Sequence, residues 1–454
     1  MQDLTKGSIA KHILLLAAPI AAGMFFQTLY YLVDLYFVAT LGEAAIAGVG
    51  AAGNINFVVM ALTQVLGAGT MALISHAVGR KDRQDANLIF NQSLLLAALC
   101  AVVTLVGGYA TADLYMHTLG ADPATIRAGL DYLVWFLPGL ALQFALIAMG
   151  SALRGTGIAK PTMIVQVASV VINAILSPIL IVGWLTGRPL GVAGAGLASS
   201  ISVAAGVAMM WLYFHRAEKY VGFDRRLFRP RLEAWRRILK IGLPPGGEFA
   251  LLFIYIGVIY WVARHFGSAA QAGFSVGSRV MQAIFLPAMA ISFATAPVAG
   301  QNFGAGLTDR VRRTFRDSAW IGSAIMLCLT LLCQWRPEIF VQVFTRDPQV
   351  VEVGSSFLRW ISLNFVASGL VFTCSGMFQA LGNSVPGVVS GATRLLTFVA
   401  PAVWLTGRPG FELHHLWLVS VISVALQAVF SLWLLRIEMR RRLAVLPRAA
   451  SRQP

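Results

Sequence analysis

The chain has 454 residues, of which 57% are hydrophobic and only 12% are charged, and its 35 lysines and arginines outnumber its 19 acidic residues. Soluble domains carry about 25% charged residues, so this composition excludes a water-soluble protein of this size and indicates a chain that folds in a lipid bilayer. The basic excess does not indicate nucleic-acid binding, because the lysines and arginines occupy short loops between long apolar runs.

Twelve apolar stretches follow one another along the chain. Each is near or above the roughly 20 residues that are needed to span the hydrocarbon core of a bilayer. We therefore predict an all-α integral membrane protein of about twelve transmembrane helices, with the first stretch retained as a helix because it is too long for a signal peptide. The stretches are 12–38, 45–75, 88–110, 127–152, 161–185, 191–214, 238–264, 270–300, 317–334, 351–378, 386–406 and 414–436.

Basic residues gather in the loops on one side of these predicted helices. The loops on the other side hold only scattered arginines, such as Arg188 and Arg408. The positive-inside rule then predicts that both termini lie in the cytoplasm, which requires an even number of helices. The basic group comprises Lys6 and Lys11, Arg80, Lys81 and Arg83, Arg154 and Lys160, the run 216–240, Arg310 to Arg316, and Arg436 to Arg442.

The two halves of the sequence are copies of one pattern. When the sequence is shifted without gaps so that Pro19 meets Pro244, other glycine, proline and tryptophan residues of the first half also meet identical residues in the second. This shift is called the repeat offset below. Further matches at this offset are Gly42 with Gly267, Gly48 with Gly273, Gly79 with Gly304, Asp122-Pro123 with Asp347-Pro348, Gly129 with Gly354, Trp135 with Trp360, Gly157 with Gly382, and Pro161 with Pro386. Both Asp-Pro pairs suit the start of a helix, because Asp caps it and Pro fits its first turn.

The repeat predicts two pseudo-symmetric six-helix bundles. The N-lobe comprises residues 1–215, the C-lobe residues 238–436, the arginine-rich cytoplasmic linker loop residues 216–237, and a basic cytoplasmic tail residues 437–454. Because six is even, both copies cross the membrane in the same sense, as in the parallel repeats of many secondary transporters. Such halves enclose a central cavity and rock around it.

No soluble-enzyme motif is present. The sequence lacks G-x-x-x-x-G-K-[ST] and H-E-x-x-H, so it predicts neither an ATP-driven pump nor a metal centre, and it implies no cofactor. The energy for any transport has to come from an ion gradient or from a partner.

Asp34, late in the first predicted helix, is the leading candidate for chemistry. Ionisable residues inside membrane spans are costly and usually functional. Tyr30 and Gln27 precede Asp34 by one and nearly two turns, so the three side chains share a face. A carboxyl group in that place can take up a proton or, when ionised, can hold Na⁺ together with neutral oxygens. The alternative is that Asp34 reaches the outer interface, about two turns before Glu43.

Other polar residues and prolines fall inside predicted spans. Pro19 lies fifteen residues before Asp34 and permits either a functional hinge or a static kink. Glu248 is a second acidic candidate, with a structural ion pair to Lys240 as the alternative. Arg394 needs a carbonyl or carboxylate partner and is interpreted as structural. The amides of Asn54, Gln143, Asn173 and Asn364 either line a cavity or bond between helices.

The ordered set of short motifs resembles the MATE (multidrug and toxic compound extrusion) transporters over nearly the whole chain. No single motif carries the resemblance. The set comprises Leu16-Ala-Ala-Pro19, Leu32-Val-Asp34 with Gly42, Gly67-Ala-Gly69 through Gly79-Arg80, Arg154-Gly-Thr-Gly157, Gly191-Val-Ala-Gly-Ala195 and Gly300-Gln-Asn-Phe-Gly-Ala-Gly306.

The resemblance implies two V-shaped lobes that export cationic or amphiphilic compounds by alternating access, in exchange for H⁺ or Na⁺. Similar proteins use an aspartate, a proline and a glutamine that correspond here to Asp34, Pro19 and Gln27. Where the family often has Asn-x-x-x-Asp-Pro, this chain reads Asn173-Ala-Ile-Leu-Ser177-Pro178. Because serine replaces the second carboxylate, we expect H⁺ to be the coupling ion rather than Na⁺.

The resemblance also implies a monomeric, multi-pass protein of the bacterial inner membrane that binds small organic substrates and lipid but no nucleic acid. A lipid-linked oligosaccharide or lipid flippase of the same superfamily is an alternative. A flippase for an anionic pyrophosphate needs several arginines in its cavity, and the spans offer mainly Arg394. A channel or a membrane enzyme is a further alternative. A channel would show flux without an exchange stoichiometry, and an enzyme would need a catalytic cluster.

Overall fold

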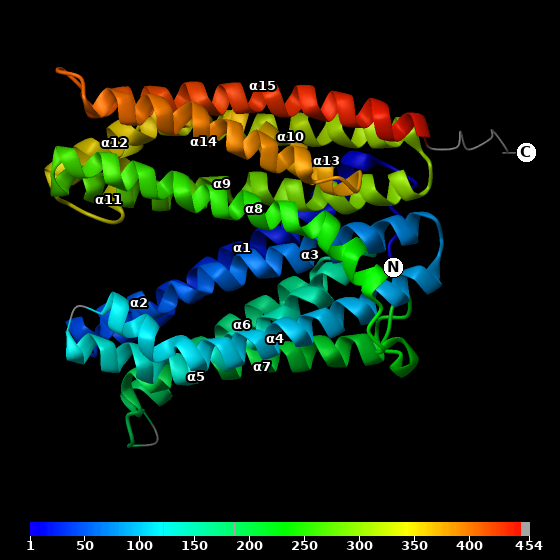
Figure 1. Ribbon diagram of the computed structural model, residues 1–454, viewed down its shortest axis with the longest axis horizontal. Helices are drawn as coiled ribbons and strands as arrows, with labels where there is room; N and C mark the ends of the chain where they lie inside the picture. The colour runs from blue at the N-terminus through cyan, green and yellow to red at the C-terminus, as the bar shows by residue number, and fades with distance from the viewer. Residues whose placement is uncertain (121, 185–186, 446–454) are drawn as a thin grey trace, which may run out of the picture. The chain divides into compact units, whose positions relative to one another are not determined.

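The computed structural model describes residues 1–120, 122–184 and 187–445, and all regular secondary structure in these ranges is helical (Figure 1). The first half contains α1 (Ile9–Ala39), α2 (Glu43–Gly53), α3 (Ile55–Gly79), α4 (Arg83–Leu119), α5 (Pro123–Gly155), α6 (Lys160–Ser177), η1 (Pro178–Val182) and α7 (Gly191–Arg216). The second half contains η2 (Arg225–Leu227), α8 (Leu232–Ala263), η3 (Arg264–Phe266), α9 (Ser268–Gly304), α10 (Thr308–Trp335), α11 (Pro337–Gln342), α12 (Pro348–Ser362), α13 (Phe365–Ala380), α14 (Val385–Thr406) and α15 (Leu413–Val445).

The predicted number of membrane spans is confirmed. Eleven helical segments of the described chain are long and apolar enough to cross a membrane, and the bent pair α12–α13 makes a twelfth when it is counted as one span. The sequence predicted one helix over 351–378, but the axis bends there by 58°. At the bend the N–H groups of Leu363 and Asn364 donate to the carbonyls of Trp360 and Ile361, which closes tight turns between the two helices.

The predicted repeat is confirmed in the helix boundaries. The helices that begin at Glu43, Arg83, Pro123 and Lys160 have counterparts that begin at the repeat offset, at Ser268, Thr308, Pro348 and Val385. Both predicted caps form, because the Asp122 carboxylate accepts from the N–H groups of Ala124 and Thr125, and the Asp347 carboxylate accepts from those of Gln349 and Val350.

Side-chain contacts and backbone angles repeat as well. Thr70 Oγ1 donates to Ser93 Oγ at 2.8 Å, and the equivalent pair Thr295 and Ser318 makes the same bond at 2.7 Å. The matched glycines Gly42, Gly267, Gly157 and Gly382 all have φ between 73° and 102°. Because side chains rarely tolerate this region, the turns that these residues form explain why glycine stands in both copies.

The contacts of the chain form two compact units. Unit 1 comprises residues 1–3 and 22–242, and unit 2 comprises residues 4–21 and 243–454. The beginning of α1 therefore belongs to unit 2, and the beginning of α8 belongs to unit 1. These borders differ from the predicted lobes, and α8 begins at Leu232, inside the predicted linker 216–237. Of the predicted tail 437–454, residues 437–445 continue α15, and residues 446–454 lie outside the described residues.

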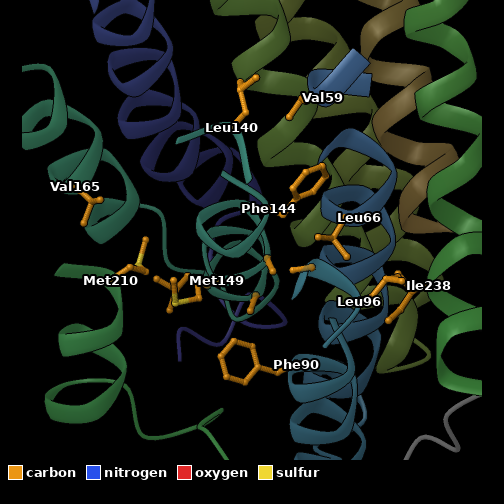
Figure 2. Packing of buried hydrophobic residues seen from close by; sticks show 14 of the residues in the cluster. Val59, Leu66, Phe90, Leu96, Leu140, Phe144, Met149, Val165, Met210 and Ile238 are labelled. Carbon is orange, nitrogen blue, oxygen red and sulfur yellow. The ribbon is translucent and has the colours of Figure 1, made fainter. Parts of the chain in front are cut away.

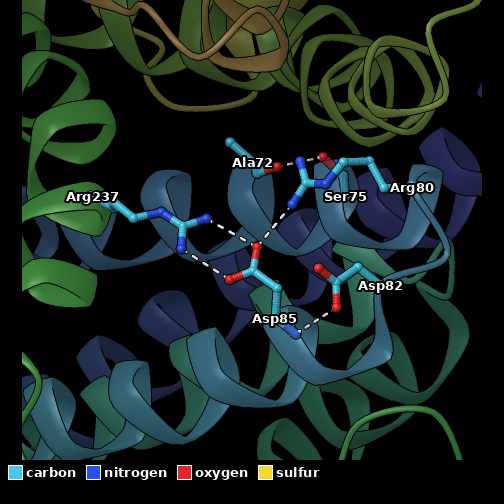
Figure 3. A network of polar contacts seen from close by, with 6 residues as sticks. All are labelled: Ala72, Ser75, Arg80, Asp82, Asp85 and Arg237. Atoms are coloured by element: carbon cyan, nitrogen blue, oxygen red, sulfur yellow. Dashed lines mark hydrogen bonds and ion pairs between the residues drawn. The ribbon is translucent and has the colours of Figure 1, made fainter.

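Ion pairs and apolar packing hold the start of α8 in unit 1. The guanidinium group of Arg237 donates two hydrogen bonds of 2.9 Å to the carboxylate of Asp85 on α4, which also accepts one from Arg80 (Figure 3). Ile238 is fully buried in the main hydrophobic cluster of unit 1 (Figure 2). The labelled members of that cluster come from α3 to α8 and are Val59, Leu66, Phe90, Leu96, Leu140, Phe144, Met149, Val165, Met210 and Ile238.

Two glycines let α3 and α8 approach each other closely. A Cβ atom on Gly242 would lie 1.8 Å from the carbonyl oxygen of Val65, and one on Gly69 would lie 2.2 Å from that of Ile238. Small residues have this role in membranes, where association depends on close packing rather than on the exclusion of water.

The crossing predicts that Gly242→Ala destabilises the protein, because the added methyl group forces α8 away from α3. Overpacking of this kind costs about 1–3 kcal/mol. Gly257→Ala in the same helix is the control, since its Cβ would meet nothing within 4 Å. In the purified protein, Gly242→Ala should lower the melting temperature and Gly257→Ala should not. Equal melting temperatures for the two variants would contradict this role of the crossing.

Candidate functional site

The leading candidate residue, Asp34, is buried inside unit 1. It is 8% exposed, so it does not extend to an exposed interface position. Asn173 and Ser177 of α6 and Ser199 of α7 interact with its carboxyl group. All three are buried as well. Three helices thus bring four buried polar side chains together inside unit 1.

Several polar atoms of this cluster lack a hydrogen bond of good geometry. Asp34 Oδ1, Asn173 Nδ2 and Ser199 Oγ are all buried without a hydrogen-bond partner among the described residues. Ser177 Oγ donates to Asn173 Oδ1 at the long distance of 3.5 Å. A buried polar group without a partner costs about 1–3 kcal/mol. The cluster therefore has polar atoms that a ligand could satisfy.

The helix geometry around Ser177 follows from the next residue. Pro178 has no N–H group, so the carbonyl of Ala174 loses its α-helical partner, and the chain continues as the π-helix η1. Single π-turns of this kind are frequent at functional sites.

The second copy of the repeat has apolar residues in place of this cluster. The positions that match Asp34, Asn173, Ser177 and Ser199 at the repeat offset are Ile259, Phe398, Ala402 and Val424. All four are buried. The second copy thus takes up the same fold with apolar residues at all four equivalent positions.

Ser199 was not among the site residues predicted from the sequence. The run Ala198-Ser-Ser-Ile-Ser202 inside an apolar span was the available signal, but it does not tell which serine faces Asp34. The structure separates them, because Ser200 Oγ donates to the carbonyl of Trp135 and accepts from the N–H of Gly139, whereas Ser199 Oγ has no partner among the described residues.

The other residues predicted for the site lie on several different helices. Gln27 and Tyr30 are half-buried on α1, on the face that carries Asp34. Asn54 is exposed at the break between α2 and α3, and Asn364 is buried at the break between α12 and α13. Gln143 is half-buried on α5. The two breaks explain Asn54 and Asn364 as helix-end residues.

Pro19 lies inside α1, which continues through it without a break in the helix. The border between the two units follows at Ala21 and Ala22, a short way beyond the proline. The two parts of α1 thus pack into different units on either side of this point.

Unit 2 has polar groups of its own. Ser375 Oγ donates to Glu248 Oε2 at 3.0 Å, and Glu248 Oε1 is buried without a partner among the described residues. Gly387 makes room for this carboxylate, because a Cβ there would lie 2.0 Å from Oε1. Arg394 lies over the ring of Tyr255 at 4.1 Å, so its partner is an aromatic face and not the expected carbonyl or carboxylate.

Comparison with known proteins agrees with the duplicated architecture. The family model MatE matches residues 19–179 and again residues 244–404, so the two matches are related by the repeat offset at both ends. Among curated proteins, "Probable multidrug resistance protein YoeA" of Bacillus subtilis is 26% identical over 396 residues, covering 86% of this chain and 85% of its own. "Multidrug export protein MepA" of Staphylococcus aureus is 26% identical over 447 residues, covering 95% of both chains.

The fold agrees with solved structures. A crystal structure described as MATE in complex with MaL6 superposes with a TM-score of 0.91 at 24% identity, covering 98% of this chain and 99% of that one. Because the two MatE matches together span well over half of the sequence, the chain belongs to the MatE family of multi-pass membrane transporters.

Proposed function

We propose that the protein exports small cationic or amphiphilic organic compounds by alternating access, in exchange for a cation that binds at Asp34. The relatives' names, multidrug resistance and multidrug export proteins, support the substrate class. The observation that carries the exchange mechanism is the buried Asp34 cluster, which has unpaired polar atoms and is replaced by apolar residues in the second copy.

The proposed coupling ion is H⁺. A proton neutralises the Asp34 carboxylate without any further ligand, whereas Na⁺ needs a shell of several oxygens. The cluster offers one carboxylate with the oxygens of Asn173, Ser177 and Ser199, and the Ser177 hydroxyl is already directed at Asn173.

Exchange requires that the ion and the substrate favour different conformations, since a ligand shifts an equilibrium only through differential affinity. Pro19 is the proposed hinge of α1, because it removes a hydrogen bond from the helix that carries Asp34. Glu248 is proposed as a second acidic group, because it is buried with one oxygen unpaired among the described residues. We further propose a monomer of the bacterial plasma membrane with cytoplasmic termini and no cofactor besides the coupling ion.

The first prediction concerns the carboxyl group itself. Asp34→Asn keeps the shape of the side chain but removes its charge, so active efflux of a fluorescent organic cation such as ethidium should fall to the level of cells without the transporter. Asp113→Asn is the control, because Asp113 lies on α4 with its side chain 78% exposed. Efflux is measured in efflux-deficient cells at matched expression, and wild-type efflux in Asp34→Asn would rule out the exchange role.

The second prediction separates the two ions. In proteoliposomes that contain the purified protein, an imposed proton gradient at equal Na⁺ on both sides should drive uptake of the organic cation against its gradient. An imposed Na⁺ gradient at equal pH should not. Uptake driven by a Na⁺ gradient alone would reject H⁺ as the coupling ion. The role of Asp34 would then be decided by the efflux measurement of the first prediction.

A further inference from the structure

A groove of about 440 Å³ lies between α10 and α15 in unit 2. Its rim carries three arginines, Arg312 of α10 with Arg436 and Arg440 of α15. Its apolar residues include Phe315 and Met439, which pack against the buried hydrophobic cluster that contains Leu435. The groove thus combines positive charge at its edge with an apolar floor.

The first copy of the repeat contains the same groove in a filled form. The equivalent positions in the first copy lie on α4 and α7, and the linker between α7 and α8 packs onto them. The ring of Phe223 lies 5.5 Å from that of Phe90, 5.9 Å from that of Phe214 and 5.2 Å from that of His215. The N–H of Gly222 donates to Asn87 Oδ1 at 2.8 Å.

The two copies differ most at the positions of the three arginines. Arg312, Arg436 and Arg440 correspond to Asn87, Trp211 and His215. In unit 1 the chain therefore covers the groove with its own aromatic and polar groups. In unit 2 the described chain leaves the groove open and surrounds it with positive charge.

The charge of the three arginines is poorly compensated within the described chain. Arg436 and Arg440 form no ion pair with any residue in the described ranges. Arg312 lies 3.9 Å from Asp309, but the two side chains are 61% and 85% exposed, so this pair is weak. The nearby Glu438 is buried and accepts hydrogen bonds from Arg442 and Asn383.

Exposed apolar side chains are present on both helices that form the groove. Trp320 on α10 and Trp433 and Val429 on α15 are all more than half exposed. Both helices are membrane spans, so these side chains face the hydrocarbon or its border. Tryptophan is enriched at the membrane–water interface, close to the depth of lipid headgroups.

We propose that this groove binds an anionic phospholipid. The phosphate group lies between Arg312, Arg436 and Arg440, and an acyl chain covers the apolar floor. Guanidinium groups bind phosphate oxygens through paired hydrogen bonds, and basic pockets between membrane helices are suited to anionic headgroups. The lipid takes the place in unit 2 that Phe223 and Gly222 of the linker occupy in unit 1.

The alternative occupant is the chain segment 446–454, which follows α15. Its charged side chains are Arg448 and Arg452, and it contains no acidic side chain. Repulsion between like charges disfavours binding of this segment between three arginines. We therefore favour the lipid as the occupant.

The test measures lipid binding to the purified full chain by native mass spectrometry and by thermal stability, with phosphatidylglycerol and phosphatidylcholine as probes. The wild type should bind phosphatidylglycerol more tightly and gain stability from it. The triple variant Arg312→Gln, Arg436→Gln, Arg440→Gln should bind phosphatidylglycerol about 100-fold more weakly, since each basic residue near an anionic lipid contributes roughly a fivefold factor.

The matched control is the triple variant Arg313→Gln, Arg316→Gln, Arg441→Gln. It removes the same charge from exposed positions on the same two helices, outside the groove. The control should keep binding close to that of the wild type. Equal loss in both variants would overturn the site in favour of diffuse attraction. A chain ending at Val445 that binds the lipid while the full chain does not would instead identify the segment 446–454 as the occupant. Neither readout depends on transport.

Discussion

The proposed function depends on one costly feature of the structure, a carboxyl group buried in a membrane span beside polar atoms that have no partners among the described residues. Asp34, Asn173 and Ser199 each leave an atom unsatisfied within the described chain, although burial makes such atoms expensive. Buried polar atoms without partners are tolerated where a ligand binds and satisfies them. An exchanger that binds and releases a cation in each cycle would relieve this cost when the cation is bound.

The duplication supplies an internal comparison that a single-copy protein lacks. Helix starts, glycine turns and the Thr–Ser hydrogen bonds repeat at one offset, so these features belong to the scaffold. Side chains that differ between the copies are those that have specialised in one unit. In the described parts of the chain, the Asp34 cluster belongs to unit 1, whereas the arginine-rimmed groove and the Glu248–Ser375 contact belong to unit 2. The two copies of the scaffold therefore carry different polar groups.

Much of the fold followed from the sequence, because apolar length, helix caps and rare matched residues are local signals. The spans, the repeat, and the caps Asp122 and Asp347 were predictable for this reason. Three features were not predictable, because each depends on tertiary contacts. They are the break between α12 and α13, the early start of α8 and the packing of Phe223. At the site, Asp34 was visible as a charge in an apolar run, but its neighbour Ser199 looked like any small helix residue.

If a proton on Asp34 is exchanged for the organic cation, as proposed, then binding of the organic cation should release that proton. Purified protein in weakly buffered solution is mixed with an organic cation over a range of pH values, and the change in pH is recorded against the amount bound. About one proton should be released per bound molecule at the maximum, and none from Asp34→Asn. Binding to the wild type without proton release at any pH would contradict this exchange.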